Sequence, residues 1–466
     1  MGCCRSPAEI KRLAEYGIVQ VHYCIIRIYR SENAKLNTKV RVIDAMDVKN
    51  TLRDQRAEFQ SIIQKDNYID REFGRNYGSY RGSNLIKTII GVRRSGKSTF
   101  TASMLSGENI GYVNFDERIL LDVDPDIILS NLIELNGNFN VIFLDEVQNV
   151  DRWELFVNKL HRRGYNVFLT GSNSRLLSRE LASHLTGRHV SLEIFPFSFR
   201  EFLVSRKVST MIESTTEENL IKHHLNDYID NGGFPDVVNG EKPGPYLKSL
   251  YDDIVEKDII SRFNISYKST FREIAMTMLS NTAKYVTYNK IKNDFGLKSD
   301  HTSKNYLLYL EESYLVLQLK KFSFKPKEIE KSAKKIYCVD TGMVNHVTSS
   351  FTENRGILME NIVFIDLMRR RNYSLGNMEI YYFKDYNGHE VDFIVKVGLE
   401  VKEVINVTYA ESRSDLEKRE LRSIVSASAL LNCRKLTLIT WNYGDTITYG
   451  GAAINAIPLW KWLLNP

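Results

Sequence analysis

The stretch IKTIIGVRRSGKSTF, residues 86–100, constrains this chain more than any other because its order of residues suits one local structure. An apolar run leads into a loop that holds Gly91, Gly96, Lys97 and Ser98 in the spacing G-x4-G-K-S. Glycines let backbone N–H groups close around phosphates, and the N-terminus of a following helix adds its positive dipole. The sequence therefore predicts a strand, a phosphate-binding loop and a helix, with a bound nucleoside triphosphate.

We expect two side chains of this loop to have tasks of their own. Lys97 would reach the β- and γ-phosphates, and the Ser98 hydroxyl would bind Mg²⁺. The predicted nucleotide-binding residues of the loop and the helix start are Gly91, Val92, Arg93, Arg94, Ser95, Gly96, Lys97, Ser98 and Thr99.

The segment NVIFLDEVQ supplies the acidic partners of such a loop. Four apolar residues run into Asp145 and Glu146, which therefore lie at the end of a buried strand. Asp145 suits binding of the Mg²⁺ that accompanies ATP, and Glu146 suits polarisation of the attacking water. ATP and Mg²⁺ are the predicted cofactors, and Glu146 is a predicted catalytic residue.

Two further polar residues are candidates for catalysis. Asn173 follows the next apolar run, in FLTGSNS, and would hydrogen-bond the γ-phosphate or the water. Arg188, in LTGRHVSLEIFPFSFREF, would stabilise transition-state charge across a subunit boundary. A polar turn and a surface arginine are the simpler interpretations of these residues.

Between residues 84 and 195 short apolar runs alternate with helical patterns, which is typical of a parallel sheet buried on both faces by helices. The fold class is therefore α/β. At 43% hydrophobic and 26% charged residues the composition is that of an ordinary soluble domain protein, with a mild net charge of +6. No apolar run reaches the roughly 20 residues that cross a bilayer. We expect a cytoplasmic protein without a membrane partner.

Several blocks of this sequence, in this order, resemble the prokaryotic AAA-type ATPases that carry a C-terminal domain of unknown function. The blocks are GVRRSGKST, FLDEVQ, TGSNS, LTGRHVSLEIFPFSFREF and NGGFPDVV. The resemblance covers nearly everything after residue 46. It implies a P-loop NTPase of the additional-strand type, with adenine nucleotide and Mg²⁺, and a winged-helix segment behind it.

The residues in the middle of the chain also predict a helix-turn-helix, independently of this resemblance. A short helix ends near Phe295, Gly296 makes the turn, and a second helix starts after a cap at Asp300 or Thr302. A recognition helix of this kind would present Thr302, Ser303, Lys304 and Asn305 to base edges. The following KKFSFKPKEIEKSAKK has seven lysines and two glutamates, as a basic wing would. DNA is a candidate partner; a packing module with a solvated lysine face is the alternative.

Near the C-terminus, GHEVDFIVKVGLEVKEV has the spacing D-x7-E-x-K. Asp392 precedes a turn at Gly398, and Glu400 and Lys402 fall on one face of the next strand. Two such carboxylates can share a divalent cation, with Lys402 beside it and Glu360 of an upstream helix as a fourth member. Exposed β-hairpins also carry this spacing, but apolar neighbours place Asp392 and Glu400 at a partly buried edge. The pattern looks like a PD-(D/E)XK nuclease, a restriction-endonuclease-like α/β fold.

Four regions follow. Residues 1–45 are an uncertain N-terminal extension, since Met46 opens a natural helical start. Residues 46–265 form an AAA-type P-loop ATPase with a helical lid, 266–350 a winged-helix-like segment and 351–466 a PD-(D/E)XK nuclease-like domain.

The leading hypothesis is an ATPase whose nucleotide state controls a DNA-binding, nuclease-like module. The alternatives are an ATP-switched signalling or scaffold protein that binds a protein partner without cleavage, and a toxin-like or defence nuclease regulated by ATP. A homo-oligomer is expected if the ATPase acts between subunits.

Overall fold

The computed structural model describes residues 45–63, 68–72, 78–172, 187–348, 355–373 and 377–465. The chain divides into two compact units, Met1–Thr51 and Leu52–Pro466. Of the predicted N-terminal extension only residue 45 is described, as the first residue of helix α2 (Ala45–Ile63). Everything below concerns the second unit.

The ATPase region is built on five strands in the order β2-β3-β4-β1-β5, and every neighbouring pair is parallel. The short apolar runs predicted as strands between residues 84 and 195 are confirmed as β1 (Ile86–Gly91), β2 (Ile110–Asn114), β3 (Val141–Asp145), β4 (Asn166–Gly171) and β5 (His189–Ile194). Strand β4 lies between the phosphate-loop strand β1 and the acidic strand β3, which is the additional-strand arrangement. The ends of these three strands therefore meet at one edge of the sheet.

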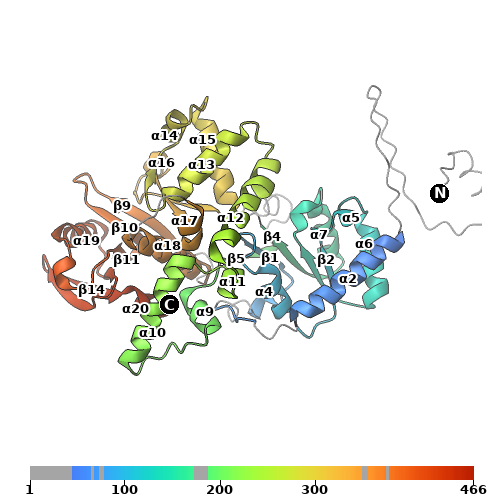
Figure 1. Cartoon of the computed structure of the whole chain (residues 1–466). Helices are drawn as coiled ribbons and strands as arrows, with labels where there is room; N and C mark the ends of the chain where they lie inside the picture. The colour runs from blue at the N-terminus through green and yellow to red at the C-terminus, as the bar shows by residue number, and fades with distance from the viewer. Residues whose placement is uncertain are drawn as a thin grey trace, which may run out of the picture. The chain divides into compact units, whose positions relative to one another are not determined.

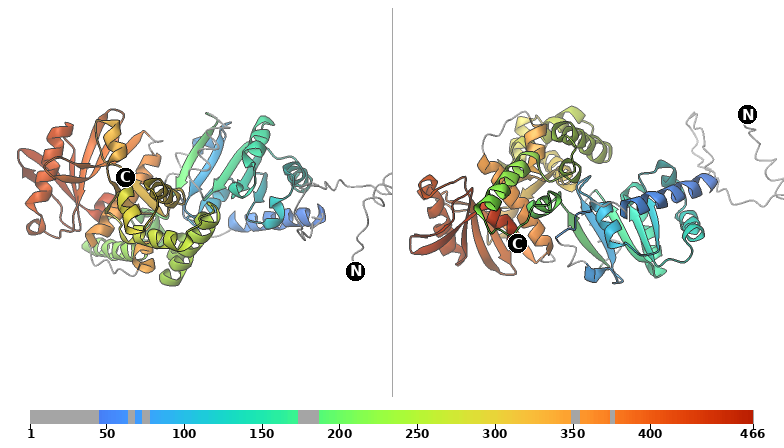
Figure 2. Two further views of the ribbon diagram at one scale, coloured as in Figure 1. Left: turned by 90° about the horizontal axis from the view of Figure 1, so that it is seen from above. Right: turned by 60° about the horizontal axis from the view of Figure 1, so that its bottom comes forward.

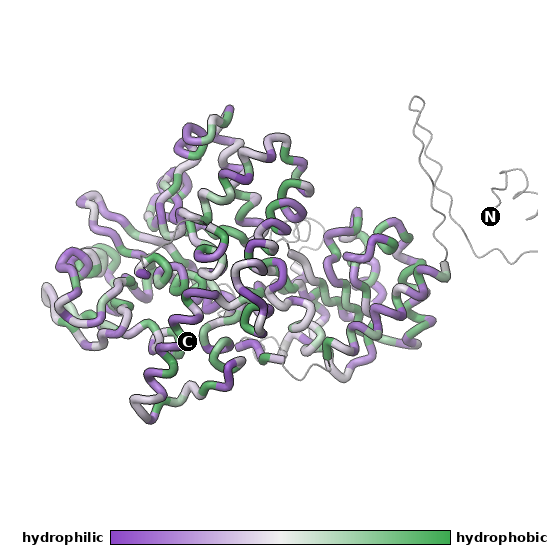
Figure 3. Tube along the Cα trace, in the orientation of Figure 1, coloured by the Kyte–Doolittle hydropathy of each residue, from purple (hydrophilic) through white to green (hydrophobic). Residues whose placement is uncertain are grey.

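Helices surround this sheet, as Figure 1 shows. They are α4 (Lys97–Met104), α5 (Arg118–Leu121), α6 (Pro125–Asn136) and α7 (Trp153–Arg162), with short 3-10 turns η1 (Gly78–Tyr80) and η2 (Val147–Asn149). The core beneath them is aromatic: the rings of Phe59 and Tyr112 lie 4.7 Å apart, and Phe143 packs against both. The strands form hydrophobic stretches in Figure 3 because both of their faces are buried.

A helical lid follows, consisting of α9 (Phe199–Ser205), α10 (Thr215–Asn231), α11 (Pro235–Val238), α12 (Pro243–Asp253) and the π-helical η3 (Ile254–Ser261). Local chemistry explains its boundaries. Ser198 with Glu201 and Ser214 with Glu217 form capping boxes that start α9 and α10. Gly232, with φ +78°, ends α10.

The middle region holds α13 (Lys268–Ser280), β6 (Tyr285–Val286), α14 (Tyr288–Asp294), α15 (Asp300–Glu312), β7 (Val316–Leu319), α16 (Pro326–Lys331), β8 (Lys334–Cys338) and α17 (Thr341–Val347). Its three strands form an antiparallel sheet in the order β6-β8-β7. The predicted turn at Gly296 is confirmed, with φ +61°. The predicted cap, Asp300 or Thr302, is wrong: Ser299 caps α15 by accepting the Thr302 N–H at 3.2 Å.

The C-terminal region has a six-stranded sheet in the order β13-β14-β12-β11-β10-β9. Its elements are α18 (Arg355–Tyr373), β9 (Met378–Lys384), β10 (Glu390–Val397), β11 (Glu400–Val407), η4 (Arg413–Asp415), α19 (Lys418–Leu431), β12 (Leu436–Thr440), β13 (Asp445–Tyr449), β14 (Ala452–Pro458) and α20 (Leu459–Leu464). β9, β10 and β11 are antiparallel neighbours, whereas β11 and β12 run parallel. Figure 2 shows this region from two further sides.

Candidate functional site

The phosphate loop has the backbone that an anion-binding loop needs. Gly96 has φ +93° and Arg94 has φ +62°, so the loop turns its backbone inward just before α4. The Lys97 ammonium is buried inside the loop, where it donates to the carbonyls of Gly91 and Val92 at 3.2 and 3.1 Å. The buried Ser95 hydroxyl has no hydrogen-bond partner within the described residues. These residues fit a bound triphosphate, with a cation and an unsatisfied hydroxyl at the same place.

Asp145 stands at the end of β3 directly beside this loop. The Ser98 hydroxyl donates to Asp145 Oδ1 at 3.0 Å, and Tyr112 donates to Oδ2 at 3.2 Å. Thr170, at the end of β4, also donates to Asp145. Burial and the neighbouring Glu146 raise the pKa of the Asp145 carboxyl, whereas the bonds from Thr170 and Ser98 lower it. A hydroxyl and a carboxylate in contact form the hard oxygen donor set that Mg²⁺ accepts.

Glu146 follows Asp145 in a left-handed conformation, with φ 50°. Its backbone N–H donates to Thr170 Oγ1 at 3.0 Å, which fixes the turn. Its carboxylate lies 4.0 Å from the Lys97 ammonium and accepts a hydrogen bond from Gln148. The predicted acid pair is therefore at the phosphate loop, and the carboxylate of Glu146 faces the place where the phosphates would end.

Two arginines of the loop point toward the lid. The Arg93 guanidinium pairs with Asp258 of η3 at 3.1 Å, and Arg94 lies 5.4 Å from the ring centre of Tyr246 on α12. Thr99 is half-buried on α4. Sequence reasoning missed Asp258 and Tyr246, which are more than 150 residues downstream of the loop and carry no motif of their own.

Thr170 was also missed, although its position was readable. It is the threonine near the end of the apolar run YNVFLTGS and so comes to the same sheet edge as Asp145. A buried hydroxyl at that place contacts both acidic residues.

The other two catalytic candidates are not at the phosphate loop. Asn173 lies outside the described residues. Arg188 is exposed just before β5, and its carbonyl accepts the Ile86 N–H at 2.8 Å. Because Ile86 begins β1 and the loop follows the end of that strand, Arg188 is one strand length, about 17 Å, from the loop. A role toward the nucleotide of another subunit stays a prediction.

A buried polar network extends from the back of the phosphate loop. Arg71 donates to the Ser95 carbonyl at 3.3 Å and to the Phe195 carbonyl, and it pairs with Glu201 at 3.1 Å. Both side chains of that pair are buried, and their mutual attraction offsets part of the cost of burying the two charges. Arg71 thus ties the loop to the PFSFREF segment, residues 196–202.

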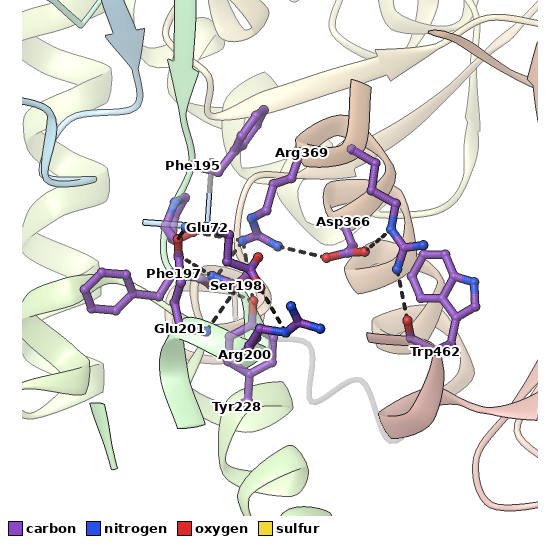
Figure 4. A network of polar contacts seen from close by, with 12 residues as sticks. Glu72, Phe195, Phe197, Ser198, Arg200, Glu201, Tyr228, Asp366, Arg369 and Trp462 are labelled. Carbon is purple, nitrogen blue, oxygen red and sulfur yellow. Dashed lines mark hydrogen bonds and ion pairs between the residues drawn. The ribbon is translucent and has the colours of Figure 1, made fainter. Parts of the chain in front are cut away.

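The same segment is held from the other side by α18, as Figure 4 shows. Arg369 donates to the carbonyls of Pro196 and Phe197 at 2.9 and 3.1 Å. Asp366 lies one helical turn before it and pairs with Arg370 at 2.7 Å. The C-terminal region is therefore joined to the ATPase through buried charged groups.

In the C-terminal region, Asp392 and Glu360 are brought together as predicted, but around a lysine. The Lys335 ammonium of β8 lies 2.7 Å from Glu360, 2.9 Å from Asp392 and 3.2 Å from Glu390. The Val407 N–H donates to Asp392 Oδ2 at 2.9 Å. We call Lys335, Glu360, Glu390 and Asp392 the lysine-carboxylate cluster.

Burial alone would lower the pKa of the Lys335 ammonium, but the three carboxylates raise it well above its ordinary value. Burial and the charge of Asp392 raise the pKa of Glu360. A charged lysine therefore occupies the centre of the cluster at neutral pH.

The predicted membership of Glu400 and Lys402 is wrong. They do pair with each other, on one face of β11, but both side chains are largely exposed. Glu400 is opposite Val397, five residues along β10 from Asp392, which is about 16 Å. The β11 residues that contact Asp392 are instead Val407, whose N–H donates to the carboxylate, and Asn406, whose side-chain oxygen accepts the Asp392 N–H at 3.1 Å. The reason is the hairpin turn at Gly398, which sends Glu400 to the end of the hairpin away from Asp392.

The residues predicted to contact DNA bases are only partly exposed and free to bind. Ser303 is buried, and the Thr302 hydroxyl is engaged with Ser299 at 3.1 Å. Lys304 is exposed and Asn305 half-buried. In the basic segment, Lys334 and Lys335 are buried.

Within the described ranges, no group of three or more His, Cys, Asp or Glu side chains is arranged to hold a metal ion. The helices described also include none long and apolar enough to span a membrane.

Comparison with known families agrees with the architecture. Residues 83–203 match the family described as AAA domain. Residues 222–354 and 355–462 match two families that are each described as a domain of unknown function, DUF8612 and DUF4143. The fold and the site thus define an AAA-type protein of the P-loop class with C-terminal domains of unknown function.

An uncharacterized protein of Methanocaldococcus jannaschii, MJ1544, is 34% identical over 402 residues, which is 82% of this chain and 89% of that protein. An uncharacterized protein of Haemophilus influenzae is 30% identical over 87% of this chain and all of its own length. This chain belongs to the same family as these two proteins. Among solved structures, the Walker-type ATPase PABY2304 of Pyrococcus abyssi is similar at 14% identity with a TM-score of 0.39, over 61% of this chain and 97% of that one.

Proposed function

We propose that this chain is a Mg²⁺-dependent ATPase whose nucleotide state is transmitted to a C-terminal module that binds a partner without cleaving it. The observation that carries the proposal is the contact between Ser98 and Asp145, with Glu146 4.0 Å from Lys97. Nucleotide binding without hydrolysis would need only the phosphate loop. An acid at the sheet edge beside the phosphate loop is the group that hydrolysis requires.

In this proposal, different residues would bind ATP and Mg²⁺. The loop backbone and Lys97 would hold the phosphates, and Ser98 and Asp145 would hold Mg²⁺, which when bound neutralises phosphate charge. Glu146 would accept a proton from the attacking water, and Thr170 keeps its backbone in place. Arg93 belongs to the loop itself and would exchange its partner Asp258 for a phosphate.

We propose further that Arg188 serves a neighbouring copy, since its distance from the loop of its own chain rules out a role there. Its exposure supports this. ATP turnover per protomer should then rise with protein concentration, and Arg188→Ala should remove that rise. Turnover that is independent of concentration would contradict it.

The middle and C-terminal regions support a winged-helix and a nuclease-like fold by their order of elements. From α13 to β8 a helix, a short strand and two helices are followed by two strands with the short helix α16 between them, an order that supports a winged helix. The order α18-β9-β10-β11-α19-β12, with β11 and β12 parallel, is that of a restriction-endonuclease-like core.

Cleavage is not part of the proposal, because the C-terminal cluster has the wrong chemistry for it. A second carboxylate and a lysine would be needed at the end of β11, where Asn406 contacts Asp392 and Thr408 follows the strand. Lys335 pairs with all three acids of the cluster, so a divalent cation would have to displace its ammonium from the place between them.

The test measures phosphate release and cleavage of linear, supercoiled and single-stranded DNA in Mg²⁺ or Mn²⁺, with and without ATP. Lys97→Ala should abolish turnover, and Glu146→Gln should slow it by a factor of about 10²–10⁴ while ATP stays bound. All DNA should stay intact. Glu146→Gln turning over at the wild-type rate would remove the catalytic assignment, and cleavage that disappears in Asp392→Ala would establish a nuclease instead.

A further inference from the structure

The segment between β7 and β8, residues 320–333, has an unusual surface that the ATPase does not use. Phe324 is 81% exposed, although its neighbour Phe322 is buried in the C-terminal core with its ring 5.2 Å from that of Phe324. Phe324 lines an open pocket of about 800 Å³ together with Pro326, Lys325, Lys327 and Lys331. An exposed aromatic ring beside several lysines combines the two groups that bind an aromatic, anionic ligand.

The charge of this surface is not cancelled within the chain. Lys320 pairs with Glu330 at 2.6 Å and Lys325 with Glu328 at 3.3 Å. No ion pair involves Lys321, Lys327 or Lys331 within the part of the chain that the structure describes, so positive charge is in excess.

The positive field extends to the start of α15. Burial lowers the pKa of Lys334, and the charges of Lys320 and Lys304 lower it further. Lys304, on the predicted recognition helix, also acts on Glu330 of α16. The exposed end of α15 and the segment after β7 therefore belong to one basic face.

We infer that this face binds single-stranded nucleic acid, with a base stacked on Phe324 and phosphates on Lys327 and Lys331. A duplex hides the faces of its bases, whereas an unpaired strand offers them to an aromatic ring, and every base has such a face. Lysines beside the ring suit the phosphates that flank the stacked base. Ser303 is buried and Thr302 is engaged, so α15 is poorly equipped for reading base edges in a duplex groove. DNA and RNA share the chemistry of this site.

The inference names the ligand of the binding module in the proposed function. It does not depend on ATP turnover, because it is tested without nucleotide, and Lys97→Ala should bind the strand as well as wild type does. A failure of hydrolysis and a failure of strand binding are thus separate results.

The experiment is fluorescence anisotropy of the full chain with labelled thymidine and uridine strands of about 20 nucleotides, which exceeds the roughly 4–16 nucleotides that one such groove covers. A mixed-sequence duplex of the same length is the competitor. Phe324→Ala should weaken binding about tenfold or more at every salt concentration, and Phe324→Trp should restore it. Comparison of the thymidine and uridine strands tells whether DNA or RNA is preferred.

Replacing the lysines should change the salt dependence of binding, which replacing the aromatic ring should not. The double variant Lys327→Gln with Lys331→Gln should reduce the slope of log K against log salt by about 0.7 for each phosphate that is no longer neutralised, whereas Phe324→Ala should leave the slope unchanged. Tyr386→Ala, which removes a ring 96% exposed on the β9–β10 turn, is the matched aromatic control. Lys242→Gln with Lys248→Gln on the lid is the matched lysine control.

Three results would overturn the inference. They are no binding of either strand by the wild-type chain, a weakening by Tyr386→Ala equal to that by Phe324→Ala, and preference for the duplex with Phe324→Ala unaffected. The first would favour a protein as the occupant of this face.

Discussion

Replacing Lys335 with methionine tests whether the lysine-carboxylate cluster is an ion-pair core or a metal site. Lys335 lies within 3.2 Å of all three carboxylates, and its side chain is 4% exposed. Methionine keeps most of the volume and removes the charge. Breaking a buried ionic group by removing one partner costs about 3–5 kcal/mol, because the remaining charges stay buried without compensation. We expect the free energy of unfolding to fall by that amount at pH 8.

The same reasoning gives the pH dependence of the destabilisation. Burial and Asp392 already raise the pKa of Glu360, and removal of the ammonium raises it further, so the variant binds protons more readily when folded than when unfolded. Its deficit should therefore shrink as the pH is lowered from 8 to about 5.5. Urea denaturation of the full chain at both pH values measures this, with Lys327→Met as the exposed-lysine control. A Lys335→Met protein as stable as wild type at pH 8, or a wild-type chain that binds Mn²⁺ at this cluster, would refute the ion-pair interpretation.

Three further expectations follow from single contacts. A Cβ on Gly91 would lie 2.1 Å from the Ile194 carbonyl oxygen, so Gly91→Ala should destabilise the chain by about 1–3 kcal/mol in thermal denaturation, whereas Gly82→Ala, which meets nothing within 4 Å, should not. Burial raises the pKa of the half-buried Glu420 to about 7, so its stabilising effect is complete below about pH 4.5 and is lost as the pH rises through 7. The free energy of unfolding of the wild type should therefore fall by about 1–2 kcal/mol between pH 5 and 8, and Glu420→Gln should flatten that fall. A wild-type free energy of unfolding that does not fall over that range would be contrary evidence. Arg369→Gln should cost about 2–4 kcal/mol in urea denaturation because two buried carbonyls lose their donor, and an unchanged midpoint would argue against that contact.

The sheet of the ATPase region was predictable because each of its strands is an apolar run buried on both faces. In such a strand the pattern does not depend on register, so all five strands could be read from the sequence. The phosphate loop was predictable for a similar reason, since Gly91 through Ser98 act through local backbone geometry. Asp145 and Glu146 followed from strand order, because parallel strands end at one edge.

The C-terminal cluster was mispredicted because its partners depend on pairing. Glu400 was matched to Asp392 by sequence spacing, but a hairpin that turns at Gly398 places Asn406 beside Asp392. Counting outward from the turn gives Ile405 as the partner, and the register shift between Val395 and Lys396, which the sequence does not reveal, moves the pairing on by one residue to Asn406. Lys335 is a different case: it is 57 residues from Asp392, on a strand of another sheet, and nothing local indicates that it turns inward.

The network around the PFSFREF segment gives the proposed transmission of nucleotide state a physical basis. Arg71 contacts the phosphate loop at the Ser95 carbonyl, the Phe195 carbonyl just before the segment, and Glu201 within it, so a shift of the loop on nucleotide binding would strain these contacts together. Arg369 of α18 donates hydrogen bonds to the carbonyls of Pro196 and Phe197, the first two residues of the segment. Because these groups are buried, none can move without its partner at low cost. These contacts join the loop to the C-terminal region, and they are the path along which the proposed transmission of nucleotide state would run.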